Sequence, residues 1–199
     1  MLEALVLVLC YFTFPVGVVL ALAVLRFLFA RGPLPAGTYP LNSPAARLWL
    51  RKAALASLPR RSFFRNAVTG YSFLGRLFLR AMGSTVGRRV LLGVDTTVAD
   101  PAMTTIGDGA LIGDGAFVSA HLIDRDRLTM APVTIGRRAT IGALAFVGPG
   151  TQVGDDAVVA TGAVVARHTR ISNREIWGGV PARKIGEIEV GAAETFHSA

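Results

Sequence analysis

The chain has 199 residues, 52% of them hydrophobic, and a formal net charge of +8. The charge is divided unevenly, because residues 1–94 hold 12 Lys and Arg against one acid, Glu3, whereas residues 95–199 hold 9 against 12. A basic half invites comparison with nucleic-acid-binding proteins, but no RNA- or DNA-binding motif accompanies it, so nucleic acid is excluded as an expected partner. The single Cys10 excludes an internal disulfide.

An uncharged stretch lies close to the N-terminus. Ala4–Leu25 contains 22 residues without a charge, enough for a helix rising ~1.5 Å per residue to cross a hydrocarbon core of ~30 Å. A signal peptide is the alternative, but it would carry Lys or Arg ahead of the apolar run, where only Glu3 stands. Basic residues follow the run from Arg26 onward, so we predict that residues 1–31 form a single-pass membrane anchor and that the rest is cytoplasmic.

Residues 32–44 are rich in proline and are predicted to form an extended linker. Ser43-Pro44 is a helix-start signal, from which we expect a helix to about Leu58, and a second helix is expected over about Phe63–Met82. Within residues 45–85 both helices carry basic and apolar residues on opposite faces. Two interpretations therefore stay open: the helices bind anionic membrane lipid, or they cap the domain that follows.

From residue 86 to residue 186 the chain repeats with a period of six. An aliphatic residue marks each clear repeat, and most are followed by glycine: Ile106, Ile112, Val118, Ile135, Ile141, Val147, Val153, Val159, Val165 and Ile171. A fixed hexad matches neither a helix nor a simple strand, and it predicts a short strand and a turn in every unit. Three units would close one triangular coil, so stacked coils bury the aliphatic side chains in a parallel β-helix. The fold is predicted to be mainly β, with residues 187–199 as a tail.

The repeat and the closing run 176–185, IWGGVPARKI, together resemble the hexapeptide-repeat acyltransferases, among them the maltose, galactoside and xenobiotic O-acetyltransferases. The resemblance covers about half of the chain. It implies a left-handed parallel β-helix, a homotrimer, and acetyl-CoA (coenzyme A) as co-substrate without a metal. A trimer of this kind holds the coenzyme in the groove between neighbouring β-helices.

The repeat is interrupted by one large insertion, between Val118 and Ile135, where 17 residues stand in place of six. A loop that leaves a rigid scaffold is a common place for function. In the acetyltransferases that the chain resembles, a catalytic His lies where such a loop leaves the coil, and the chain returns through Pro-Val-x-Ile-Gly. His121 and residues 132–136 match this arrangement within the predicted loop 121–134.

By that resemblance His121 is the general base that takes a proton from the acceptor hydroxyl or amine, since imidazole titrates near neutral pH. Asp124, Asp126 or a backbone carbonyl would orient its ring. The alternative is that His121 is an ordinary surface-loop histidine, which is how we interpret His168.

The resemblance also implies a donor site for coenzyme A. Backbone groups of Ala143, Ala160, Thr161 and Gly162 would contact the pantetheine arm. Arg183 and Lys184 would contact the nucleotide phosphates, and Trp177 would stack or pack nearby. The alternative is that Thr161 and Gly162 are ordinary corners of the repeat and that Trp177 only closes the end of the coil.

Three functional hypotheses follow. The first is a membrane-anchored, trimeric acyltransferase that moves an acyl group, most simply acetyl, from coenzyme A to a small-molecule or lipid-linked acceptor. The second rests on Gly37–Leu41, the Arg-rich helices and the His121 loop, which are similar to the membrane-bound C-terminal part of poly-lysine-synthetase-like enzymes, and it implies amide formation from a carrier-bound aminoacyl thioester. The third is a non-catalytic scaffold. A γ-class carbonic anhydrase needs three His ligands and fits poorly, because one of the three His lies in the tail.

Overall fold

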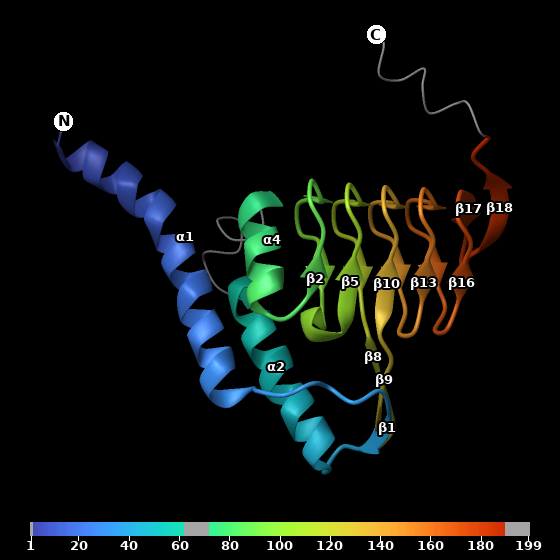
Figure 1. The fold of residues 1–199 in the computed structure, drawn as a ribbon, viewed down its shortest axis with the longest axis horizontal. Helices are drawn as coiled ribbons and strands as arrows, with labels where there is room; N and C mark the ends of the chain where they lie inside the picture. The colour runs from blue at the N-terminus through green and yellow to red at the C-terminus, as the bar shows by residue number, and fades with distance from the viewer. Residues whose placement is uncertain (1, 62–71, 190–199) are drawn as a thin grey trace, which may run out of the picture.

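In a computed structural model of the chain, which describes residues 2–61 and 72–189, a stack of parallel coils is capped at its N-terminal end by helices (Figure 1). Three parallel sheets form the sides of the stack. The five-stranded sheet contains β16 (Arg170–Ile171), β13 (Gln152–Val153), β10 (Val133–Ile135), β5 (Thr104–Ile106) and β2 (Thr85–Val86). The four-stranded sheet contains β15 (Val164–Val165), β12 (Phe146–Val147), β7 (Phe117–Val118) and β4 (Thr97–Val98).

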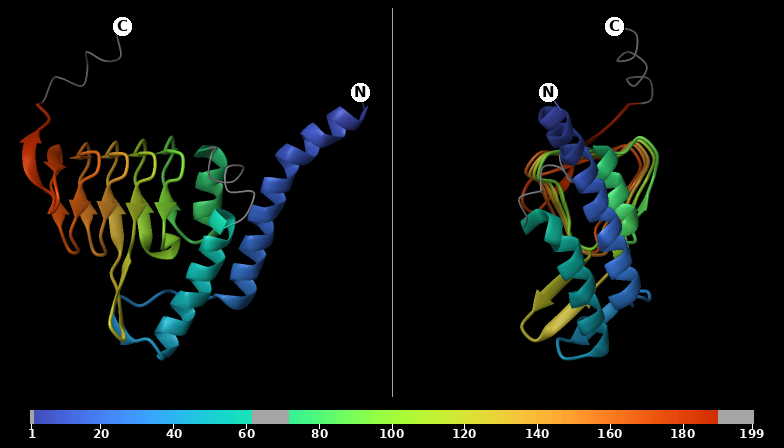
Figure 2. Two further views of the ribbon diagram at one scale, coloured as in Figure 1. Left: turned by 180° about the vertical axis from the view of Figure 1, so that it is seen from behind. Right: turned by 90° about the vertical axis from the view of Figure 1, so that its left-hand side faces the viewer.

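The third side is a six-stranded sheet whose last strand turns back antiparallel on its neighbour. Its order is β18 (Arg183–Glu187), β17 (Glu175–Gly178), β14 (Val158–Val159), β11 (Thr140–Ile141), β6 (Leu111–Ile112) and β3 (Leu91–Leu92). The coils overlie one another in the view along the stack (Figure 2). The predicted parallel β coil is therefore confirmed.

The aliphatic residue of each hexad fills the interior of the stack. All ten of the aliphatic residues that mark the repeat are at most 3% exposed. The small residues four positions later, such as Ala110, Ala139 and Ala163, are fully buried as well. The interior has room for one branched and one small side chain per hexad, so burial of this apolar row supplies the main driving force for folding.

The corners bring successive coils into backbone contact. A Cβ added at Gly107 would lie 2.7 Å from the backbone N of Arg137 in the next coil. Acidic side chains also tie the coils together, since Asp155 Oδ1 accepts the backbone N–H of Arg137 at 2.7 Å and Asp155 Oδ2 accepts its Nε at 3.0 Å. These hydrogen bonds, the backbone one first, lower the pKa of Asp155.

The predicted loop leaves the coil as a hairpin of β8 (His121–Asp124) and β9 (Arg127–Met130). Residues of the predicted linker complete it: β1 (Gly37–Pro40) pairs antiparallel with β9, with Thr38 opposite Thr129. Part of the segment expected to be a linker is thus a strand, because the hairpin offers it an unpaired edge. Figure 1 shows β1 and the hairpin projecting together from one side of the stack.

Helix α2 (Pro44–Arg61) begins where the sequence predicted, with Ser43 Oγ accepting the N–H of Ala46 at 3.2 Å. It continues past the predicted end at Leu58 and contains Pro59, so that proline does not stop the helix. Helix α4 (Ser72–Ala81) ends just before Gly83, as predicted, while the first part of the expected helix, residues 63–71, lies outside the described residues.

The helices pack on the open end of the coil stack. Arg76 Nη1 of α4 donates to the carbonyl of Val90 at 2.7 Å, and Arg80 Nη2 donates to the carbonyl of Val86 at 2.7 Å. Phe78 and Leu79 of α4 are buried in the same hydrophobic core as the first coils. The second of the two interpretations, a helical cap, is therefore present in the structure.

Helix α1 (Leu2–Phe29) is one described helix that is long and apolar enough to cross a membrane. Its N-terminal half diverges from the rest of the molecule (Figure 2) and exposes residues such as Leu5 and Leu9. Its C-terminal half contacts α4 and α2, and Val19 and Leu22 are buried in the core there. The apolar stretch is thus divided into an exposed part and a packed part.

Substitutions of two glycines in one corner test the importance of coil-to-coil contact. Gly107→Ala places a Cβ against the backbone of the next coil, and we expect a loss of about 3 kcal/mol in the free energy of unfolding. Gly109→Ala has only the Arg138 Cγ within reach, at 3.4 Å, and we expect about 1 kcal/mol from its φ of +69°. Denaturant unfolding of both variants measures the difference. Equal losses would contradict the contact argument.

Candidate active site

His121 is the first residue of β8, at the point where the hairpin leaves the coil. This position is the corner between the four-stranded and five-stranded sheets, which we call the His121 corner; it comprises Ser119–His121 and, in later coils, Pro149–Gly150 and Arg167–His168. Two interruptions of the hexad meet here. One is the hairpin, and the other is η1 (Pro101–Met103), a short 3₁₀ turn in the coil before it.

The carboxylate of Asp100 lies within hydrogen-bond distance of the His121 ring. Its Oδ2 is 2.6 Å from His121 Nδ1, and the same oxygen accepts the backbone N–H of Ala120 at 2.9 Å. Its Oδ1 accepts the indole Nε1–H of Trp49 at 2.8 Å. The Asp100 side chain is only 1% exposed. A buried carboxylate is costly unless donors replace its hydration, and these three hydrogen bonds engage both of its oxygens.

Two further side chains surround the imidazole. The Trp49 ring of α2 packs against it with 4.7 Å between ring centroids and planes tilted by 56°. Ser119 Oγ donates to the carbonyl of His121 at 2.9 Å and lies 3.3 Å from Nδ1. The His121 side chain is 23% exposed, so one edge of the ring faces solvent while the other is held.

This arrangement determines what His121 can do chemically. Because Asp100 accepts, the neutral ring is held with its hydrogen on Nδ1, and Nε2 keeps its lone pair as an acceptor. When Nε2 takes up a proton, the neighbouring carboxylate stabilises the imidazolium. The pair is therefore suited to general-base catalysis, with Asp100 as a positioning residue.

The side chain that contacts His121 Nδ1 belongs to a residue that the sequence did not indicate. Asp124, the expected partner, is at the far end of β8 and lies opposite Arg127 in the hairpin. The side chain at Nδ1 is Asp100, and α2 contributes Trp49. The two-residue slip of the hexad between Val98 and Ile106 was the available signal, since Asp100 lies within it.

The residues expected to bind coenzyme A gather at a different corner. Ala143 and Ala160–Gly162 occupy successive coils between the six-stranded and four-stranded sheets, where the N–H of Gly162 donates to the carbonyl of Ala143 at 2.8 Å. We call this the Ala143 corner, and it includes the exposed Leu144. Trp177 adjoins it, because its carbonyl accepts the N–H of Ala160 at 2.8 Å. Within one chain, these residues and His121 therefore lie at different corners of the coil.

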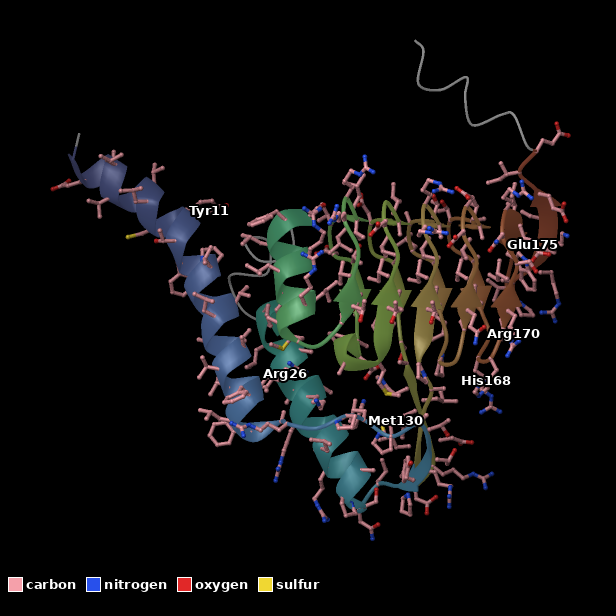
Figure 3. The ribbon with its side chains drawn as sticks, viewed as in Figure 1. Tyr11, Arg26, Met130, His168, Arg170 and Glu175 are labelled. Atoms are coloured by element: carbon pink, nitrogen blue, oxygen red, sulfur yellow. The ribbon has the colours of Figure 1, made fainter. Side chains whose placement is uncertain are left out.

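The basic pair expected at the phosphates lies on β18. Lys184 makes ion pairs with Glu187 and Glu175, which raise the pKa of Lys184 in that order. Arg183 is exposed and donates to the neighbouring Ala182 carbonyl. His168 and Arg170 are exposed near the same end of the stack (Figure 3). Across residues 2–61 and 72–189, no group of three or more His, Cys, Asp or Glu side chains is placed to hold a metal ion.

Comparison with known proteins agrees with this architecture. The family model described as the hexapeptide repeat of succinyl-transferase matches residues 84–120 and 132–167, on both sides of the hairpin. Over these residues the chain is similar to hexapeptide-repeat proteins. The unmatched residues between the two segments are those of the hairpin, so the insertion is a departure from the bare repeat.

Several solved structures share the fold of this chain. A maltose O-acetyltransferase from Clostridium difficile 630 aligns with a TM-score of 0.60 and 20% identity, over 79% of this chain and 95% of the other. A hexapeptide-repeat acetyltransferase from Vibrio cholerae aligns with a TM-score of 0.55 and 19% identity, over 77% and 97%. A galactoside acetyltransferase in complex with coenzyme A aligns with a TM-score of 0.53 and 19% identity, over 82% and 90%.

Among curated proteins, a delta-poly-L-ornithine synthetase from Acinetobacter baumannii (strain AB307-0294) is 25% identical over 118 residues. The match covers 59% of this chain and 9% of the synthetase, so the chain spans less than a tenth of that relative. The likeness concerns one segment of a much longer enzyme.

The tautomer of His121 tests the orienting role of Asp100. We expect ¹⁵N NMR of the neutral ring to show the hydrogen on Nδ1, because Asp100 Oδ2 accepts it. Asp100→Asn should give a mixture of tautomers, since an amide can donate as well as accept. Asp124→Asn is the matched control and should leave the spectrum unchanged. A change in the control without a change in Asp100→Asn would assign the role to Asp124 instead.

Proposed function

We propose that this protein is an acyltransferase that moves an acyl group, with acetyl as the simplest case, from coenzyme A to a hydroxyl or amine acceptor. The observation that carries the proposal is the His121–Asp100 pair, joined at 2.6 Å where a hairpin leaves the coil. The comparisons support the chemistry, because solved proteins of the same fold include acetyltransferases, one of them in complex with coenzyme A.

His121 is the general base in this proposal. Its Nε2 removes the proton from the acceptor oxygen or nitrogen as that atom attacks the thioester carbonyl, and Asp100 stabilises the resulting imidazolium. When the tetrahedral intermediate collapses, the C–S bond breaks and His121 returns the proton to the departing thiolate. Backbone N–H groups at the coil edge would stabilise the oxyanion. Trp49 and Asp100 hold the imidazole in one orientation throughout.

The donor would lie at the Ala143 corner of a neighbouring subunit in a trimer. An extended thioester arm would find room there, because a Cβ added at Gly162 would meet no atom within 4 Å, and Ala143 and Ala160 have small side chains. In a single chain this corner is separate from His121, so a second copy is needed to complete the site. Exposed apolar residues near this corner support the assembly: Leu144 is 71% exposed, and Phe117 stacks on Phe146 at 5.9 Å.

Helix α1 would anchor the trimer in a membrane, with the left-handed β-helix on the cytoplasmic side. The exposed apolar residues of its N-terminal half and the basic residues that follow support this orientation. The packed C-terminal half would lie at the membrane surface with α4, whose Phe73 is exposed. An anchored site suggests an acceptor that is lipid-linked or delivered at the membrane.

A second candidate is amide formation from a carrier-bound aminoacyl thioester. The match to the poly-ornithine synthetase favours it, although that match covers only 9% of the synthetase. Both candidates use His121 to deprotonate an acceptor that attacks a thioester. They differ in the thiol that carries the acyl group, so binding of free coenzyme A separates them. A scaffold without catalysis would need neither a base at His121 nor a bound thioester.

Acetyl-CoA binding and turnover test the first candidate. Isothermal titration should show micromolar binding that is kept in His121→Ala, because the base contacts the acceptor rather than the coenzyme. Release of thiol in the presence of hydroxyl and amine acceptors should fall about 10²- to 10⁴-fold in that variant. Asp124→Ala is the control and should retain activity. Failure to bind acetyl-CoA or coenzyme A would overturn the first candidate.

Membrane attachment is tested on the exposed face of α1. Leu9 and Val16 are exposed, so the double substitution to Arg leaves the fold intact but adds two charges to the apolar helix. Each Arg near the centre of a span costs about 3 kcal/mol of insertion free energy. We expect the double variant to leave the membrane fraction after carbonate extraction, whereas the matched double Ala variant stays. Retention of the Arg variant would contradict the anchor.

A further inference from the structure

The main chain at His121 leaves the coil-to-coil hydrogen bonding of the stack. Two residues earlier, the N–H of Ser119 still donates to the carbonyl of Val147 in the next coil, at 3.0 Å. At His121 the chain continues as β8, which is an edge strand of the three-stranded sheet β1-β9-β8. The N–H and C=O groups of His121 therefore need partners that the next coil does not supply.

Strand β9, the neighbour of β8, does not supply them either. Hydrogen-bonded and non-hydrogen-bonded pairs alternate along an antiparallel ladder. The N–H of Ala131 donates to the carbonyl of Ala120 at 2.9 Å, and the next pair along the ladder is His121 with Met130. That pair is thus of the non-hydrogen-bonded kind. The N–H and C=O of His121 point away from β9, toward the open edge of the sheet.

The hydroxyl of Ser119 bonds to both of these groups. Its Oγ donates to the His121 carbonyl at 2.9 Å and accepts the His121 N–H at 3.3 Å. The same oxygen lies 3.3 Å from the ring Nδ1, beside the shorter contact of that nitrogen with Asp100. Ser119 is only 3% exposed, so the hydroxyl is shielded from water. One buried hydroxyl thus contacts both the main chain and the side chain of the proposed base.

The same arrangement is present at the open end of the stack. Leu92 lies in β3, an edge strand of the six-stranded sheet. Ser72 Oγ donates to the Leu92 carbonyl and accepts the Leu92 N–H, both at 3.1 Å. In both places a serine hydroxyl completes the main chain of an edge strand. Ser72 joins α4 to the first coil in this way, whereas the residue that Ser119 fixes is the candidate base.

We infer that Ser119 is a positioning residue for His121. Asp100 fixes the tautomer of the ring through Nδ1, but a ring held at one nitrogen can still move with its backbone. Ser119 removes that freedom, because it holds the main chain from which the ring extends. A general base must stay within hydrogen-bond reach of the proton it removes, and a displacement of about 1 Å can lower a rate by about 10²-fold. The effect on rate rests on the proposed function, whereas the effect on the ring rests on the contacts alone.

Ser119→Ala and Ser72→Ala form a matched pair, since each removes one hydroxyl that bridges the N–H and C=O of an edge-strand residue. Both should lower the Tm of the full-length protein in dodecylmaltoside micelles by about 2–4 °C. In Ser119→Ala we expect kcat for thiol release from acetyl-CoA to fall about 10- to 100-fold, while the Kd for acetyl-CoA stays unchanged. Ser72→Ala should keep both values. Ser119→Cys, whose thiol is a weaker donor and acceptor, should fall between the wild type and Ser119→Ala.

¹⁵N NMR of the His121 ring supplies a readout that needs no turnover. The ring signals should broaden or split in Ser119→Ala, because the imidazole takes more than one orientation, and should match the wild type in Ser72→Ala. Unchanged ring signals in folded Ser119→Ala overturn the inference whatever the activity. A wild-type kcat in that variant, or an equal loss of kcat in Ser72→Ala, overturns it too. If the wild type itself shows neither acetyl-CoA binding nor turnover, the proposed function fails, and the ring signals alone decide the role of Ser119.

Discussion

The buried carboxylate of Asp100 connects three parts of the molecule that are distant in sequence. Its oxygens accept from Trp49 on α2, from the backbone of Ala120 at the coil corner, and from His121 at the start of the hairpin. Each donor is needed, because a charge removed from water is stable only if hydrogen bonds replace its hydration. The cap, the coil and the candidate base are therefore positioned by one group. Loss of the hydrogen bond from Trp49 to Asp100 would therefore change the position of the imidazole.

The coil stack makes this connection possible because it is rigid at the corners. Backbone atoms of successive coils approach so closely that Gly107 has no room for a Cβ, and the interior row of aliphatic side chains is fully packed. A corner in such a stack cannot drift, so a hairpin that leaves it begins from a fixed point. Strand β1 then covers the outer edge of that hairpin. In this way the segment between α1 and α2 becomes part of the support for the site.

The basic N-terminal half and the more acidic C-terminal half of the sequence form different parts of the fold. The acidic residues of the β-helix are used within it, as where Asp155 binds Arg137 and Asp156 binds Arg138. The cap instead satisfies its arginines with backbone carbonyls and keeps its positive charge. A surface of that sign beside an exposed apolar helix is suited to an anionic membrane surface.

The period of six in the sequence was enough to predict the parallel coil and its buried rows, because each hexad can bury its apolar residue only by stacking. The gap in the period between Val118 and Ile135 predicted a loop, and the structure forms a hairpin there. It also placed His121 where the hairpin leaves the coil. It did not identify Asp100 or Trp49, and nearness in sequence favoured Asp124. The slip between Val98 and Ile106 changes the spacing of paired residues, so that Val98 lies opposite Val118, and this register brings Asp100 under Ala120.

Such a register, and the choice of which face of α2 packs inward, depend on contacts between segments far apart in the chain. The sequence by itself therefore determined the repeat and the point of its interruption. Only the tertiary structure decided the hydrogen-bond partner of the histidine and the helix that packs against its ring.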